Sequence, residues 1–204
     1  MAAVILAAPI SALALYKPTR LLLPEAFGVH CRSNICVDDP RRLNTARKLF
    51  HTAKRYLQDK HDLFLDEPRI VFCTTESCQH TFGLGRKAGF TFGTPGIAIA
   101  PRGWKMHYIA HELKHRWQAD NFGNLALMQG DPWLIEGMAY ALSNDQRKKL
   151  SEPFETYRRR FIAWQQANAG ESLQGCRSSS SLALSARTCS AFSCSCSSTV
   201  LRLT

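Results

Sequence analysis

Apolar residues in the middle of the chain recur at two spacings, and each spacing predicts one kind of element. A helical spacing predicts a helix over residues 41–59, with apolar positions at Leu43, Ala46, Leu49, Phe50, Ala53 and Leu57. Further helices are expected over residues 76–84, 103–120, 132–144 and 152–166. Short β-like runs bounded by turn signals predict strands over residues 69–75, 89–92 and 96–100. This order of elements predicts a small α+β domain.

The N-terminal residues 1–24 are expected to form an apolar anchor or an export signal. Residues 1–15 are apolar and rich in alanine, but they are fewer than the roughly 20 residues that a membrane-spanning helix needs. Ala12-Leu13-Ala14 fits a signal-peptide cleavage site, although no basic residue precedes the apolar run. An apolar segment that packs on the domain is the alternative.

The C-terminal residues 174–204 are expected to be a disordered tail. They hold ten serines and four of the eight cysteines, and they contain no aspartate or glutamate. A segment of this composition buries too little apolar surface to fold. It is either a genuine flexible tail or the product of a reading-frame shift near Gln174. The folded domain is therefore expected over residues 25–173.

The other four cysteines form two pairs with the same spacing, Cys31 with Cys36 and Cys73 with Cys78. Such pairs can form disulfides in an oxidising compartment, can hold a zinc ion together, or can remain free thiols, and the spacing leaves these alternatives open. Disulfides would indicate an extracytoplasmic domain, whereas Lys17 and Arg20, which follow the apolar run, favour a cytoplasmic one. We expect a membrane-associated or exported protein with an extracytoplasmic domain, and a cytoplasmic location is the alternative.

The formal net charge of +10 permits an acidic partner, an anionic membrane surface or nucleic acid. No basic block is interleaved with aromatic residues, as it would be in a nucleic-acid-binding module, and no internal repeat is present. Nucleic acid is therefore not expected as a partner. We interpret the positive charge as a basic surface that is exposed to solvent.

The most specific chemical signal is the motif His-Glu-x-x-His at His111, Glu112 and His115. Residues four apart lie on one face of a helix, so both imidazoles can point at one metal ion. Glu112 lies one step round the helix, within reach of a water molecule beside that ion but not in a ligand position. The alternative is a pair of histidines that only cap or pack.

A catalytic zinc site needs a third protein ligand and an open position for water. No histidine follows His115, so a third histidine downstream is excluded. Glu136 lies 21 residues after His115 in a predicted helix, and the turn at Gly130-Asp131-Pro132 can bring that helix back across the first. Glu136 therefore remains as the candidate for a third ligand beside His111 and His115.

Two motifs resemble those of the gluzincin clan of zinc metallopeptidases, which includes thermolysin-like enzymes and zinc aminopeptidases: His111-Glu112-Leu113-Lys114-His115 and Trp133-Leu134-Ile135-Glu136-Gly137-Met138-Ala139. The chain is most similar to the small, uncharacterised, often membrane-tethered members of the clan. The resemblance implies a minimal zincin-like domain, in which a small β-sheet precedes an active-site helix and then a glutamate-bearing helix. It implies His111, His115 and Glu136 as zinc ligands and Glu112 as the general base and proton shuttle. It also implies that the strand at residues 96–100 aligns an extended substrate by backbone pairing.

The chain departs from this family at three positions. Lys114 and Arg116 carry positive charge where the motif usually has uncharged residues. Tyr140 stands where thermolysin-like members place an aspartate that orients a histidine. Its hydroxyl is a candidate for that orienting role or for stabilising an oxyanion, and a packed tyrosine is the alternative. Four further residues are candidate donors to an oxyanion: His107, Tyr108, Tyr157 and Arg158.

The function expected from these signals is hydrolysis of a peptide or protein substrate by a zinc-activated water, with Glu112 as general base and Tyr140 as a second catalytic candidate. One alternative is a non-catalytic binding or assembly protein with the same fold. Another is a basic protein that binds nucleic acid or a membrane surface, in which the histidines are incidental.

Overall fold

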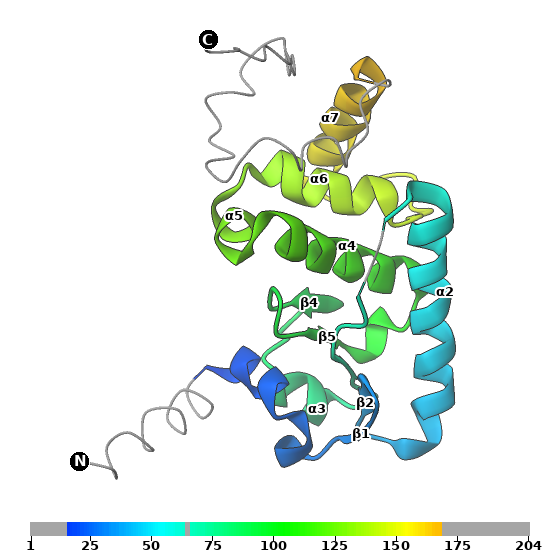
Figure 1. Cartoon of the computed structure of the whole chain (residues 1–204), viewed down its shortest axis with the longest axis vertical. Coiled ribbons are helices and arrows are strands. Elements are labelled where there is room, and N and C mark those ends of the chain that lie inside the picture. Colours follow the sequence, from blue (N-terminus) through cyan, green and yellow to red (C-terminus); the bar gives the residue numbers. More distant parts are fainter. Residues whose placement is uncertain (1–15, 64–65, 169–204) are drawn as a thin grey trace, which may run out of the picture.

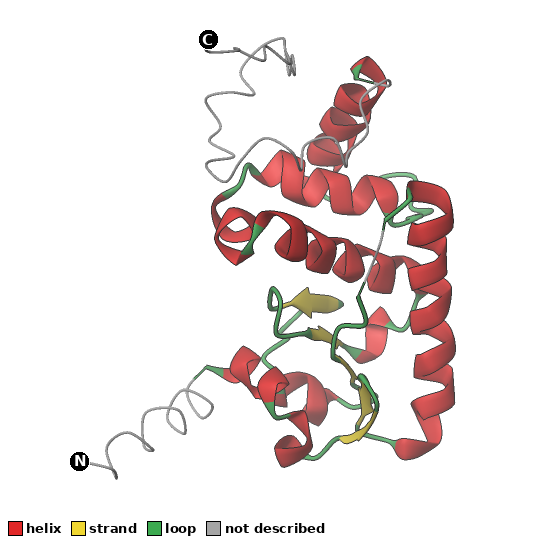
Figure 2. Ribbon diagram, viewed as in Figure 1, coloured by secondary structure: helices red, strands yellow, loops and turns green. Residues whose placement is uncertain are grey.

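The computed structural model describes residues 16–63 and 66–168, with a mixed five-stranded sheet at its centre (Figures 1 and 2). The order of strands across the sheet is β1-β2-β3-β5-β4. Their bounds are His30–Arg32 (β1), Ile35–Val37 (β2), Ile70–Phe72 (β3), Gly89–Thr91 (β4) and Ile97–Ile99 (β5). Strands β2, β3 and β5 run parallel, and β1 and β4 pair antiparallel at the two edges.

Helices form at each of the five predicted places, and their ends differ by a few residues from the prediction. The helices are α2 (Leu43–His61), α3 (Glu76–Thr81), α4 (Met106–Phe122), α5 (Asn124–Gln129), α6 (Pro132–Leu142) and α7 (Phe154–Ala167). Short 3-10 helices add η1 (Lys17–Leu22), η2 (Pro24–Phe27), η3 (Pro40–Arg42) and η4 (Pro101–Gly103). The α+β class is confirmed, whereas β1, β2 and α5 were not predicted.

Alternation along the central strands gives the sheet two apolar faces. In β3, Ile70 and Phe72 join one core cluster and Val71 joins another. The neighbouring strands divide in the same way, with the outer positions of β2 and β5 in the first cluster and their middle positions in the second. The first cluster lies against α2 and α4. The second lies against α3 and the N-terminal 3-10 helices, so the sheet is covered on both sides.

The helices are stacked in order above the first face of the sheet (Figure 1). α4 lies over the strands, α6 crosses α4 on its far side, and α7 packs on α6. α2 runs along one side and contacts both the sheet and α4. Gly137 lets α6 and α7 approach closely, because a Cβ atom there would meet the backbone carbonyl of Tyr157. The helix that bears Glu136 is thereby held between α4 and α7.

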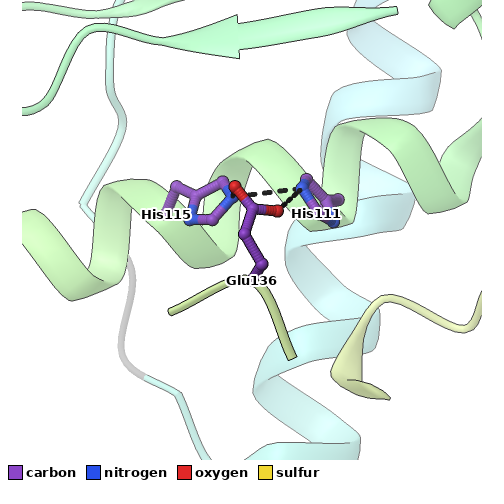
Figure 3. Close-up of side chains that lie close together, drawn as sticks. All are labelled: His111, His115 and Glu136. Atoms are coloured by element: carbon purple, nitrogen blue, oxygen red, sulfur yellow. Dashed lines mark hydrogen bonds and ion pairs between the residues drawn. The ribbon is translucent and has the colours of Figure 1, made fainter. Parts of the chain in front are cut away.

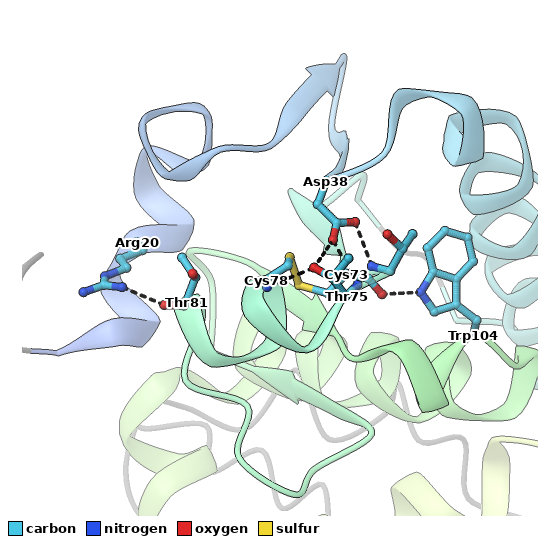
Figure 4. Close-up of a disulfide and its surroundings, with 8 residues drawn as sticks. Arg20, Asp38, Cys73, Thr75, Cys78, Thr81 and Trp104 are labelled. Carbon is cyan, nitrogen blue, oxygen red and sulfur yellow. Dashed lines mark hydrogen bonds between the residues drawn. A yellow bond between two sulfur atoms is a disulfide. The ribbon is translucent and has the colours of Figure 1, made fainter.

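Both predicted cysteine pairs are disulfides. Cys31 and Cys36 are opposite one another in the β1–β2 hairpin. The Cys73–Cys78 bond ties the end of β3 to α3 (Figure 4). The carboxylate of Asp38 accepts hydrogen bonds from the backbone of Thr74 and Thr75 beside it. The disulfides and the hydrogen bonds of Asp38 together hold the elements on the face of the sheet opposite α4 in place.

The expected N-terminal and C-terminal segments fall mostly outside the described residues, since residues 1–15 and the whole predicted tail at 174–204 lie there. The described part of the first segment packs on the domain. Leu21 is fully buried in the second core cluster, and Arg20 donates a hydrogen bond to the carbonyl of Thr81 (Figure 4). Within residues 16–63 and 66–168, no helix is both long and apolar enough to cross a membrane.

Candidate metal centre

Helix α4 presents two different faces to its surroundings. Ile109, Leu113 and Trp117 lie on the face that joins the first core cluster. His111 and His115 lie one turn apart on another side, with their rings 4.7 Å apart between centroids. Burial on the core side fixes the rotation of the helix, and that rotation directs both imidazoles toward α6.

His111, His115 and Glu136 come together as predicted (Figure 3). The Nε2 atoms of the two histidines are 3.1 Å apart. The carboxylate oxygens of Glu136 lie 3.5 Å from Nε2 of His111 and 3.6 Å from Nε2 of His115. A tetrahedral ion with ligand bonds of 2.0–2.2 Å would separate its ligand atoms by about 3.3–3.6 Å. The three side chains therefore have a spacing at which they could hold a metal ion.

The electrostatics of the group favour a charged carboxylate. Burial by itself would raise the pKa of Glu136, but the hydrogen bonds and charges of His111 and His115 outweigh burial and hold this pKa well below its ordinary value. For His115, burial acts to lower the pKa, and the bonds and charge of Glu136 raise it overall. Glu136 and the histidines thus stabilise each other's charged forms against the effect of burial. A cation among the three residues would stabilise the carboxylate in the same way.

Gln118 connects the two helices that carry the group. Its amide oxygen lies 2.8 Å from Nδ1 of His115, and its amide nitrogen donates to the carbonyl of Ile135, the residue before Glu136, at 3.0 Å. The side chain is fully buried. In the neutral imidazole, this arrangement places the Nδ1 proton toward Gln118 and leaves the lone pair of Nε2 available to a cation beside Glu136. Gln118 was not predicted from the sequence, although its position three residues after His115 puts it near the histidine face of α4.

Glu112 is buried between α4 and the edge strand β4. The hydroxyl of Thr91 lies 2.7 Å from its Oε2 atom and 2.9 Å from its backbone carbonyl. The predicted general base therefore stands on the sheet side of the histidines, while Glu136 approaches from α6. Thr91 was not predicted from the sequence, because a strand residue has no fixed sequence distance from the motif on α4 that would place the two together.

Tyr140 packs its ring on His111, with 4.3 Å between ring centroids. Burial and the charge of Glu136 raise the pKa of Tyr140 to about 12, so the phenol stays neutral at ordinary pH. Its hydroxyl has no hydrogen-bond partner among the described residues. Tyr140 therefore does not orient a histidine as an aspartate would, and Gln118 has that contact with His115 instead.

The further donor candidates lie outside the three-residue group. His107 stacks on Tyr108, and the guanidinium of Arg147 lies over the rings of Tyr108 and Tyr140 at 5.4 and 5.9 Å. Arg158 pairs with Glu155 and donates to the carbonyl of Arg147, so it holds the loop before α7. Tyr157 lies on α7. The remaining histidines of the described residues lie outside the group: His30, His51, His61 and His80.

The two unusual charges in the motif do not face the histidines. Lys114 is fully buried on the core side, with its ammonium 3.3 Å from the centroid of the Trp117 ring. Arg116 pairs with Asp120 one turn further on. Both departures from the family pattern are therefore compatible with the three-residue group.

The strand expected to align a substrate, at residues 96–100, corresponds to β5, and that expectation is wrong. β5 pairs with β3 on one side and with β4 on the other, so it has no free edge. The edge strand next to β5 is β4, which also contacts α4. The sequence identified both strands but could not give their order across the sheet.

Comparisons of the chain with protein-family models, with curated proteins and with solved structures find no match.

Proposed function

We propose that the protein is a zinc-dependent peptidase of the gluzincin type, acting on peptide or protein substrates. The observation that supports this most is the convergence of His111, His115 and Glu136 at metal-ligand spacing, with the carboxylate of Glu112 on the adjoining side. Neither feature alone is specific, because histidines and acidic groups also cluster in proteins without metals. Together they supply three ligands and a separate base.

Zinc suits this donor set better than magnesium or calcium do. Two imidazoles and one carboxylate are typical zinc ligands, whereas magnesium and calcium prefer oxygen ligands alone. A group of three also matches catalytic zinc sites, in which the fourth position is kept for water or substrate. When bound in such a site, zinc supplies Lewis acidity that activates water and polarises a carbonyl.

Glu112 would take the proton of the attacking water and pass it to the leaving amine. This role requires a carboxylate that is close to the reacting atoms and not itself a ligand. Glu112 meets the second requirement, because it lies outside the ligand group and its Oε2 atom is engaged by Thr91. Tyr140, neutral and beside His111, is the nearest candidate to donate a hydrogen bond to an oxyanion.

The free edge of β4 suits an extended peptide. Two hydrogen bonds flank the pairing of β4 with β5: the amide of Phe92 donates to the carbonyl of Gly96, and the amide of Ala100 donates to the carbonyl of Ala88. Because hydrogen-bonded pairs alternate along an antiparallel ladder, Phe90 also directs its backbone groups toward β5. The backbone groups of Gly89 and Thr91 then point to the free edge, where a substrate strand would pair with them. Such a substrate would pass next to Glu112, since Thr91 contacts that residue directly.

We further propose that the domain works outside the cytoplasm, either exported or attached to a membrane through its N-terminal segment. Two disulfides support an oxidising compartment, because such bonds are rare in proteins that stay in the cytosol. They outweigh the charge argument from Lys17 and Arg20, which concerns the orientation of a spanning segment only.

The activity is tested by incubating the zinc-loaded full-length protein with a mixture of internally quenched fluorescent peptides. Glu112→Gln removes the base and retains the ligands, so cleavage should fall by a factor on the order of 10² to 10⁴ with zinc content unchanged. Cleavage that survives this substitution, or that is missing in a zinc-loaded parent, would contradict the proposal. The latter result would favour a non-catalytic binding protein with the same fold.

A further inference from the structure

The edge strand β4 is shaped around the carboxylate of Glu112, and we propose that Thr91 is a positioning residue for this general base. The inference rests on the proposed peptidase function and adds to it the group that holds the base in place. Two residues of β4 carry the argument, Thr91 through its hydroxyl and Gly89 through its lack of a side chain.

Gly89 and Thr91 face the same side of the sheet, because side chains along a strand alternate. That side is α4, which contacts β4. A Cβ atom at Gly89 would lie 2.7 Å from Cγ and 2.8 Å from Oε1 of Glu112. The Glu112 side chain thus lies across the Cα atom of Gly89 and ends with Oε2 on the hydroxyl of Thr91, 2.7 Å away. The strand defines where both carboxylate oxygens can be.

The Thr91 hydroxyl is suited to both forms of a carboxyl group that gains and loses a proton. A hydroxyl has one proton to donate and can also accept. It can donate to Oε2 of the carboxylate before the proton is taken from water. It can then accept from the protonated carboxyl while donating to the backbone carbonyl of Glu112, 2.9 Å away. In this step one O–H bond of water breaks and one O–H bond of the carboxyl group forms.

Because the contact between Thr91 and Glu112 is buried, loss of its hydrogen bond should have a measurable effect. Thr91 and Glu112 are both buried, so water does not readily replace the hydroxyl. A carboxylate that loses such a donor either stays under-bonded or rotates toward another partner. Two single substitutions separate the effect of the hydroxyl from that of the shape of the side chain. Thr91→Val keeps the shape and removes the hydroxyl, and Thr91→Ser keeps the hydroxyl and removes the methyl group.

The first measurement is a double-mutant cycle in urea unfolding of the metal-free, full-length protein, which combines Thr91→Val with Glu112→Met. A hydrogen bond to a charged group should make Thr91→Val lower the folding constant by about tenfold or more when Glu112 is present, and by markedly less when Met replaces it. Thr91→Ser should restore most of the loss. Equal effects of Thr91→Val in both backgrounds would overturn the inference.

The second measurement is the affinity of acetohydroxamate for the zinc-loaded protein, followed by calorimetry. A hydroxamic acid gives up its proton when it binds zinc, and a base beside the zinc accepts it. Thr91→Val should weaken binding by a factor of about ten or more at unchanged zinc content, whereas Thr91→Ser should remain close to the parent. An affinity that Thr91→Val leaves unchanged would overturn the inference. A parent that binds no zinc would instead contradict the proposed function, while the unfolding cycle would still decide whether Thr91 holds Glu112.

Discussion

At the residue scale, Gln118 links two members of the candidate metal group. It contacts Nδ1 of His115 with its oxygen and the backbone before Glu136 with its nitrogen. One residue therefore holds the ring orientation of His115 and ties α4 to the helix that carries Glu136. By contrast, Nδ1 of His111 is buried and has no hydrogen-bond partner among the described residues. Nδ1 of His115 therefore has a hydrogen-bond partner that orients the ring, whereas Nδ1 of His111 has none among the described residues.

Replacing Gln118 with Leu should weaken zinc binding by a factor of about 10 to 100, the usual effect of losing a residue that orients a ligand. The reason is that His115 loses its fixed ring orientation and α6 loses its tie to α4. The measurement is a competition titration of zinc against a chelator of known affinity. Gln118→Glu is the control, because it keeps an acceptor for the Nδ1 proton. Equal affinity of Gln118→Leu and the parent would show that the contact is only structural.

Lys114 is a second residue whose surroundings predict a measurable effect. Its side chain is fully buried, its ammonium has no hydrogen-bond partner in the described part of the chain, and its contact is the face of Trp117. Burial lowers the pKa of Lys114 well below its ordinary value. Between that lowered pKa and the unfolded value near 10.4, the unfolded chain binds more protons, so folding becomes more favourable as pH rises.

Lys114→Met should therefore be more stable than the parent at neutral pH, and the difference should shrink as pH rises toward about 10, by at most ~1.4 kcal/mol per pH unit. The measurement is urea unfolding of both proteins across this range of pH. Lys48→Met on the exposed side of α2 makes the same chemical change at the surface and should show no such trend. A difference for Lys114→Met that is constant with pH would contradict the account.

At the scale of elements, η1 belongs to the domain although its sequence adjoins an apolar N-terminal run. Leu21 and Leu22 are neighbours in η1, yet Leu21 is fully buried and Leu22 is 49% exposed. Leu21 lies in the cluster that also contains both cysteines of the Cys73–Cys78 bond. η1 thus covers part of the face of the sheet opposite α4.

Leu21→Ala should lower the free energy of unfolding by about 2–4 kcal/mol, because it removes a buried side chain and leaves a cavity. Leu22→Ala deletes the same atoms at a partly exposed position and should change it by well under 1 kcal/mol. Urea unfolding at neutral pH gives both values. Similar losses for the two variants would mean that η1 is not docked as described.

Other elements show where sequence patterns stop being informative. The β1–β2 hairpin turns through Ser33-Asn34, where Ser33 has a φ of 59°, and this pair lacks the glycine that marks such turns in a sequence. Helix α5 is six residues long and has no fully buried residue. Patterns of apolar residues found the long helices and the inner strands β3 and β5 because those elements bury a regular face.

At the scale of the whole molecule, the three residues of the candidate metal group could be picked out in the sequence, whereas the residues that contact them could not. His111 and His115 belong to one motif, and Glu136 remained as a candidate because no histidine follows His115. Thr91 and Gln118 are ordinary polar residues whose roles arise only when β4, α4 and α6 are brought together. For the same reason the order of strands, and with it the free edge at β4, was not contained in the local pattern.

The whole arrangement places the candidate site between two units that fold from different parts of the chain. The sheet contributes β4 on one side of α4, and the helical layer contributes α6 on the other. A substrate paired with β4 would therefore meet Glu112 first and the three-residue group behind it.

The most direct test of the proposed zinc site is the zinc content of the purified full-length protein, by mass spectrometry of the metal, beside its His115→Ala and Glu136→Ala variants. We expect about one zinc ion per chain in the parent and much less in both variants, because a site with three protein ligands cannot spare one. A folded parent that takes up no zinc, even when zinc is supplied, would contradict the account.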